Sequence, residues 1–166
     1  MRLSHLEEAI AIGNECWTRD YTTQTWGRKG ERDFPFISSL SINAGDVQCF
    51  VSGSCDQTAR LWDRRTGNRA VQTYPGHGGD VNTVQFFPDG LRFGTGSDDG
   101  ICKIFDTRTG HELQKYSEAS LSSQSAKANA IGFSSSGRLL FAAYSNADCY
   151  IWDTITATVL FHCFLT

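Results

Sequence analysis

Polar and apolar residues alternate along several short segments of the chain, most clearly along Asp80–Phe86. A period of two residues sends successive side chains to opposite faces of an extended chain, so this segment predicts a half-buried β-strand. One face of the predicted strand carries Val81, Thr83 and Gln85. Asp89-Gly90 follows as a turn signal, which makes this strand the first of an antiparallel pair.

The same unit continues with further strands and turns. Residues 91–95 have the composition of a second strand, and Asp98-Asp99-Gly100 is a second turn signal. Residues 101–105 predict a third strand, and a fourth begins at Glu112 after another turn. Four short antiparallel strands in a period of about 43 residues predict one blade of a β-propeller.

This unit is one of three similar units. Each has a polar turn followed by a strand that ends on an aromatic residue and an aspartate. These closing pairs are Trp62-Asp63, Phe105-Asp106 and Trp152-Asp153. They lie 43 and then 47 residues apart. Self-similarity at such a period is typical of propellers and other repeat architectures, and it predicts an all-β chain.

Composition and charge narrow the classes of function. The chain has 166 residues and a net charge of −3, so it lacks the basic surplus that favours nucleic-acid binding. No apolar run approaches the roughly 20 residues that span a bilayer, so we expect a cytosolic chain without direct membrane insertion. The 6 cysteines include no CxxC pair and the 4 histidines lack metal spacing, which predicts free thiols, no metal and no cofactor.

Several motifs resemble those of known repeat proteins. Gly76-His77 and the two Trp-Asp pairs resemble the GH and WD marks of WD40 repeats. The runs 76–90 and 93–100 resemble the β subunit of heterotrimeric G proteins, and residues 144–150 look most like its land-plant form. The resemblance covers about residues 37–160. It implies a partial WD40 β-propeller of about three four-stranded antiparallel blades, with the ring not closed.

The resemblance also implies a division of the chain. The propeller region covers residues 36–166, with units at about 36–75, 76–117 and 118–166. A ring of seven such units needs roughly 300 residues, so we expect a truncated product: a splice form, a partial gene model or a fragment. Residues 1–35 do not match the family, and the helical spacing of Leu3, Leu6 and Ile10 predicts a short helix or a disordered leader. The apolar, uncharged run 159–165 predicts an aggregation-prone segment.

One set of polar residues suggests either a buried network or catalysis. In WD40 blades a loop His, a strand Ser or Thr, a turn Asp and the Trp of the closing pair form a hydrogen-bond network. The resemblance places His77, Thr95 and Asp99 in this network in the middle unit, Ser52, Asp56 and Trp62 in the first, and Trp152 in the third. Phe105 cannot donate as Trp does, and Ala142 lacks a hydroxyl, so no unit holds a complete set. The alternative is a Ser/His/Asp catalytic set; the resemblance favours the structural network and a protein that is not an enzyme.

A second set lies in loops predicted at one rim. The resemblance implies that this rim binds the α subunit in its GDP state through Cys55, Asp80, Asn82 and Asp98. The two carboxylates can pair with basic side chains of a partner, although solvated turn acids are the alternative.

The implied function is a non-catalytic signal-transduction scaffold at the cytosolic face of the plasma membrane. Its partners would be the α subunit, a γ subunit and effectors, and its membrane association would come through these partners. Two alternatives stay open: a generic WD40 protein-interaction fragment, and a truncated product without stable function.

Overall fold

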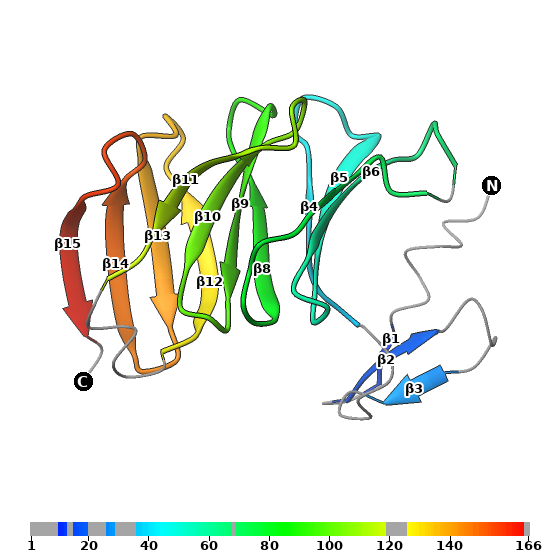
Figure 1. Cartoon of the computed structure of the whole chain (residues 1–166), viewed down its shortest axis with the longest axis horizontal. Coiled ribbons are helices and arrows are strands. Elements are labelled where there is room, and N and C mark those ends of the chain that lie inside the picture. Colours follow the sequence, from blue (N-terminus) through cyan, green and yellow to red (C-terminus); the bar gives the residue numbers. More distant parts are fainter. Residues whose placement is uncertain are drawn as a thin grey trace.

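The strands of the chain form separate antiparallel sheets, each built from strands that are consecutive in the sequence (Figure 1). The computed structural model describes residues 36–67, 69–118 and 126–164, and the backbone of residues 10–12, 15–19 and 26–28. The last three segments are strands β1 (Ile10–Ile12), β2 (Glu15–Arg19) and β3 (Trp26–Arg28), which form a three-stranded sheet. The predicted leader residues Leu3 and Leu6 lie outside the described residues, and Ile10 begins β1.

Three four-stranded sheets follow. The first comprises β4 (Ile37–Ile42), β5 (Cys49–Ser54), β6 (Ala59–Asp63) and β7 (Gln72–Tyr74). The second comprises β8 (Val81–Phe86), β9 (Arg92–Ser97), β10 (Cys102–Asp106) and β11 (Glu112–Tyr116). The third comprises β12 (Ala128–Phe133), β13 (Leu139–Tyr144), β14 (Asp148–Asp153) and β15 (Val159–Phe164). The predicted all-β class and the partial propeller are thereby confirmed.

The three four-stranded sheets stand face to face in the order of the chain (Figure 1). Strand β8, the first of the second sheet, contacts both β4 and β12, which are the first strands of the neighbouring sheets. None of the three sheets closes on itself, and no helix occurs in the described ranges. Consistent with this, the part of the chain that the structure describes contains no helix of the length and apolarity needed to cross a membrane.

Apolar side chains fill the two spaces between adjacent sheets. The layer between the first and second sheets consists of Val51, Ala59, Leu61, Tyr74, Val81, Val84, Phe86, Phe93 and Phe105. The layer between the second and third sheets is centred on Phe87, Cys102, Ile104, Tyr116, Ala128, Leu140, Ala142, Tyr144, Tyr150 and Trp152. The second sheet therefore buries apolar residues on both of its faces.

A β-bulge changes the predicted faces of β8. The register shifts between Val81 and Thr83, so these two residues do not share a face. Val81 packs with Val84 and Phe86 against the first sheet. A bulge inserts one extra residue and thereby reverses the alternation, which the pattern of residue types alone did not indicate.

Polar bridges repeat between successive sheets. The Tyr74 hydroxyl at the end of the first sheet lies 3.3 Å from the carbonyl oxygen of Thr107 in the second. The Tyr116 hydroxyl at the end of the second sheet donates to the carbonyl oxygen of Thr154 in the third, at 2.7 Å. Both phenol rings are buried, and burial raises the pKa of Tyr74 to about 12. Each tyrosine thus satisfies its polar end on the next sheet while its ring packs in the apolar layer.

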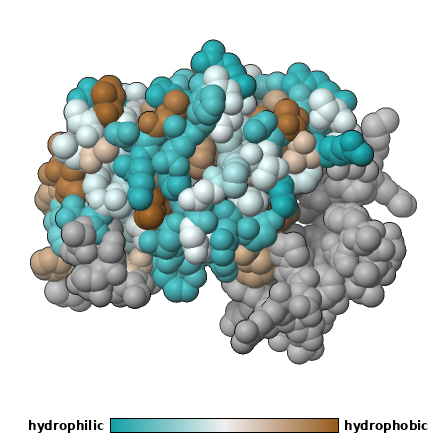
Figure 2. All heavy atoms as spheres, viewed as in Figure 1, coloured by the Kyte–Doolittle hydropathy of each residue, from teal (hydrophilic) through white to brown (hydrophobic). Residues whose placement is uncertain are grey.

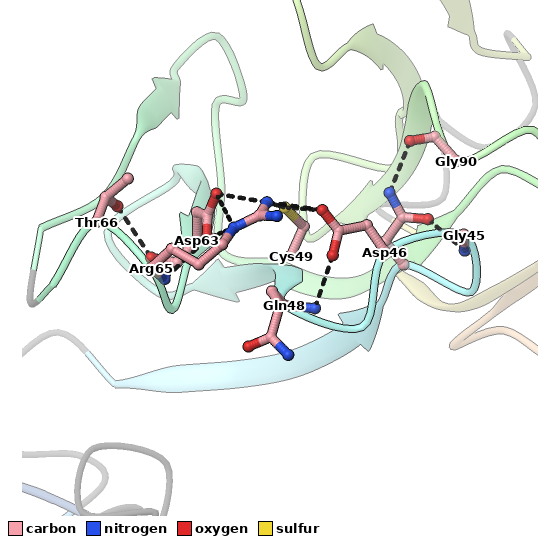
Figure 3. Close-up of polar contacts among 9 residues, drawn as sticks. Gly45, Asp46, Gln48, Cys49, Asp63, Arg65, Thr66 and Gly90 are labelled. Carbon is pink, nitrogen blue, oxygen red and sulfur yellow. Dashed lines mark hydrogen bonds and ion pairs between the residues drawn. The ribbon is translucent and has the colours of Figure 1, made fainter.

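The aspartate of each closing pair shapes the turn that follows it. Asp63 accepts hydrogen bonds from the backbone N–H and the guanidinium of Arg65, and Arg65 also reaches Asp46 at 2.7 Å (Figure 3). These hydrogen bonds lower the pKa of Asp63. The same turn forms in the other two sheets. Asp106 accepts from the backbone N–H groups of Arg108 and Thr109, and Asp153 accepts from those of Ile155 and Thr156. The repeated aspartates are therefore explained by local turn chemistry.

Two glycines of β9 set how closely the second and third sheets approach. A Cβ atom on Gly96 would lie 2.8 Å from Thr83 Cγ2 and 3.1 Å from Ala128 Cβ. A Cβ atom on Gly94 would lie 2.7 Å from the Phe133 ring. The absence of side chains here lets the β12 residues fill the space, as expected where another strand approaches a backbone closely.

We predict that Gly96→Ala lowers the free energy of unfolding by about 1–3 kcal/mol, because the added methyl group would overlap the side chains of Thr83 and Ala128. Urea unfolding followed by circular dichroism measures this change. Gly132→Ala is the matched control, since a Cβ atom at this strand glycine meets nothing within 4 Å. Equal losses in both variants would contradict the explanation by close approach.

Candidate functional site

The predicted rim residues lie at one end of the sheets, in loops or beside them. Asp80 immediately precedes β8, Asn82 lies within it, and Asp98 begins the turn after β9. The Asp98 N–H donates to the carbonyl oxygen of Asp80 at 2.8 Å, and Asn82 Nδ2 donates to Asp98 Oδ1 at 2.6 Å. Asn82 Nδ2 also lies 3.1 Å from the carbonyl oxygen of Ala128, in the third sheet. The structure therefore brings these three predicted residues together where two sheets meet.

Cys55 lies at the same rim, in the turn after β5. Its sulfur accepts a hydrogen bond from the Phe36 N–H at 3.0 Å. Burial raises the pKa of the Cys55 thiol, and the negative charges of Asp80 and Asp56 raise it further. All four predicted contact residues are partly exposed. Cys55 directly follows β5 and Asp80 directly precedes β8, and these two strands are in contact, so the first and second sheets both contribute to this rim.

Lys127 is a member of this rim that the sequence interpretation missed. It forms an ion pair with Asp98, and the resulting hydrogen bond raises the pKa of Lys127. The Lys127 side chain is 52% exposed, whereas that of Asp98 is 24% exposed. The signal was available in the repeat, because Lys127 lies 47 residues after Asp80 and so occupies the same place in the third unit. The rim is thus a mixed surface of acidic, basic and amide groups.

The predicted network residues of the middle unit also meet. His77 Nδ1 lies 3.0 Å from Asp99 Oδ2, and His77 Nε2 lies 2.7 Å from Thr95 Oγ1. A carboxylate only accepts, so Nδ1–H donates to Asp99, and in the neutral ring Nε2 accepts from the Thr95 hydroxyl. Burial alone would raise the pKa of Asp99, but hydrogen bonds from His77 and the Gly78 N–H outweigh it and lower the value to about 2.

Burial decides what this set can do chemically. Thr95 has 0% exposure, and the His77 side chain is 1% exposed. No substrate can reach a nucleophile there, so the arrangement ties the loop before β8 to the β9–β10 turn. Within the described ranges, no three His, Cys, Asp or Glu residues lie together in a way that could hold a metal ion.

The first sheet contains only part of the predicted network. Trp62 Nε1 donates to Ser52 Oγ at 2.9 Å. Asp56 does not join them: its carboxylate accepts from the hydroxyl and N–H of Thr58 and pairs with Arg60. Asp56 therefore closes its own turn, as Asp99 also does through the Ile101 N–H.

The third sheet leaves its tryptophan without an acceptor. Trp152 is 2% exposed, and its Nε1–H has no hydrogen-bond partner among the described residues. Ala142, which is fully buried, occupies the place that Ser52 and Thr95 hold in the other sheets. A buried donor without an acceptor costs about 1–3 kcal/mol, so this position is a defect in the packing of the third sheet.

We predict that Ala142→Ser raises the free energy of unfolding by about 1 kcal/mol, because the new hydroxyl accepts from Trp152 Nε1. Urea unfolding measures the change. Ala143→Ser is the control: its side chain is exposed, and we expect a change within about 0.5 kcal/mol. If Ala142→Ser is no more stable than Ala143→Ser, Trp152 is not an orphaned donor.

Comparisons with known proteins agree with this architecture. A family model described as "WD domain, G-beta repeat" matches residues 28–63, 68–106 and 115–153, which is more than half of the chain. This chain belongs to the WD40-repeat family. The second match runs from before β7 to the end of β10, so this repeat is offset from the second sheet by one strand. This repeat therefore contains the last strand of the first sheet and the first three strands of the second sheet.

The chain is also similar to plant proteins named guanine nucleotide-binding protein subunit beta. It is 60% identical over 126 residues to those of Oryza sativa subsp. japonica and Zea mays, and 56% identical over 124 residues to that of Nicotiana tabacum. Each match covers 75% of this chain and 33% of the relative. The predicted resemblance to land-plant G-protein β subunits is thereby confirmed, and the chain spans about a third of the length of these relatives.

Proposed function

We propose that this WD40 chain is a non-catalytic signalling scaffold that binds the GDP-bound α subunit of a heterotrimeric G protein. The identity of 56–60% to plant β subunits supports the class of partner. The observation that carries the proposal is the ordered rim cluster, in which Asn82 and Lys127 both hold the Asp98 side chain. An acidic group held in one orientation pairs with a basic partner side chain at a lower entropic cost than a mobile one.

The rim offers more than one kind of contact. Asp80 and Asp98 supply negative charge, Asn82 can donate and accept, and Cys55 adds a small, partly exposed thiol. Lys127 supplies a positive charge beside Asp98, so a partner must match an alternating pattern. Such charge complementarity favours specificity and rapid association.

The similarity to plant G-protein β subunits also supports further partners. We propose a γ subunit and effectors as additional partners, and the cytosolic face of the plasma membrane as the place where the complex acts. In this scheme the membrane anchor belongs to the partners.

The test measures the affinity of the purified chain for a rice G-protein α subunit loaded with GDP or with a GTP analogue. We expect preference for the GDP form, and we expect Asp98→Asn to weaken binding by about tenfold. This substitution removes the charge but keeps an oxygen that can accept from Asn82. Raised salt should weaken α-subunit binding by the unmodified chain more than binding by the Asp98→Asn variant.

Asp89→Asn is the matched control. Asp89 lies in the β8–β9 turn at the opposite rim, where it pairs with Arg92. We expect it to change the affinity less than about twofold, because surface charges away from a contact contribute little. A folded chain that does not bind the GDP-loaded α subunit, or an equal loss with both variants, would contradict the proposal.

A further inference from the structure

Two cysteines face each other across the last pair of strands. Cys149 in β14 and Cys163 in β15 are direct partners in the antiparallel register. Both are free thiols and both are partly exposed. This arrangement is separate from the rim cluster, and the proposed partner binding does not use it.

The internal repeat shows that the pair is specific to the third sheet. In the first sheet the equivalent partners are Ala59 and Tyr74, and in the second they are Cys102 and Tyr116. There the tyrosine reaches across to the next sheet. Cys163 takes the place of that tyrosine, so the third sheet has two thiols where the others have a small residue and a phenol.

The spacing of antiparallel partners suits a covalent bond. Directly opposite Cα atoms lie about 4.5 or 5.5 Å apart, and disulfides join Cα atoms that are about 4.4–6.8 Å apart. The side chains of opposite residues also point to the same face of the sheet. Burial raises the pKa of the Cys149 thiol, and the Cys163 thiol opposite it in the register raises it further.

The other described cysteines lack such a partner. Cys49 is opposite Asp63, and Cys102 lies between Gly96 and Tyr116 and is fully buried. Cys55 lies in a turn. Among these residues only one pair is therefore placed for an intramolecular disulfide.

We propose that Cys149 and Cys163 form a cross-strand dithiol that a low-molecular-weight disulfide oxidises reversibly to a disulfide joining β14 and β15. This site goes beyond the proposed function and does not depend on it.

The reaction proceeds by two thiol–disulfide exchanges. One cysteine thiolate attacks glutathione disulfide, which forms a protein–glutathione mixed disulfide and releases one glutathione thiolate. The opposite cysteine then attacks the protein sulfur of the mixed disulfide and releases the second glutathione. Two protein thiols are oxidised, glutathione disulfide is reduced to two thiols, and the two cysteine protons end on the released glutathione molecules.

The bond would hold the edge strand in place. Within the described residues β15 pairs only with β14, and it exposes Leu160, Phe161 and Phe164. Figure 2 shows apolar residues at this end of the molecule, in the region of β14 and β15 in Figure 1. An edge strand that detaches presents unpaired backbone groups and apolar side chains, which favours aggregation. Oxidation would therefore protect the segment that the sequence predicts to be aggregation-prone.

The experiment equilibrates the full folded chain in buffers of reduced and oxidised glutathione, then blocks free thiols by alkylation. A protease that cleaves before aspartate separates the two cysteines at Asp153. We expect mass spectrometry to recover the Cys149 and Cys163 peptides linked, and the intact oxidised chain to carry two fewer alkyl groups than the reduced chain. Hydrogen exchange at residues 159–164 should slow by up to about a hundredfold in the oxidised chain, because the bond closes a short loop.

Three controls test the role of the fold. In urea, half-oxidation of the pair should need a ratio of glutathione disulfide to squared glutathione concentration that is at least about tenfold higher, because unfolding removes the strand register that holds the two thiols together. Cys163→Ser should leave Cys149 as a glutathione mixed disulfide, whereas Cys55→Ser should leave the linked pair unchanged. Recovery of both cysteines as unlinked peptides from the folded chain, or equal linkage in urea, would overturn the proposal.

Discussion

The packing of one sheet face against the next is the interaction on which the rest of this structure depends. Each of the three larger sheets is only four strands wide, and its apolar side chains alternate between two faces, so a single sheet cannot bury them alone. The second sheet is covered on both faces by the two apolar layers. Close approach is possible because β9 carries Gly94 and Gly96 where β12 crosses it. Stability in such an array comes largely from contacts between neighbours.

Hydrogen bonds from buried polar side chains fix how the packed sheets and their turns are positioned. Tyr74 and Tyr116 bridge successive sheets at their outer strands, and His77 joins a loop to the β9–β10 turn through Thr95 and Asp99. The His77 bonds hold the β9–β10 turn that carries Asp98, and the ion pair of Lys127 extends the rim to the third sheet. A surface built from loops on a rigid scaffold suits the recognition of another protein. The orphaned Trp152 donor shows that the third sheet is the least complete of the three.

The sequence predicted what depends on local chemistry. Strands, turns and the period followed from alternation and from turn residues such as Asp98-Asp99-Gly100, and the resemblance supplied the order of the sheets. The β8 bulge was missed because it depends on how Val81 packs against another sheet. The Asp98–Lys127 pair joins residues of different sheets, so no local pattern marks it. The sequence therefore named Cys55, Asp80, Asn82 and Asp98 as candidates but not Lys127, and only the structure supplied their arrangement.

The central claim is that shared apolar layers make the three sheets one cooperative unit. Native-state hydrogen exchange at increasing urea tests it most directly, because it reports the opening free energy of each strand separately. The account predicts that the most protected amides of β5, β9 and β13 converge on a single global opening with the same urea dependence. Separate openings, with β5 or β13 exchanging at a much lower free energy than β9, would show that the sheets are stable independently and would contradict the claim.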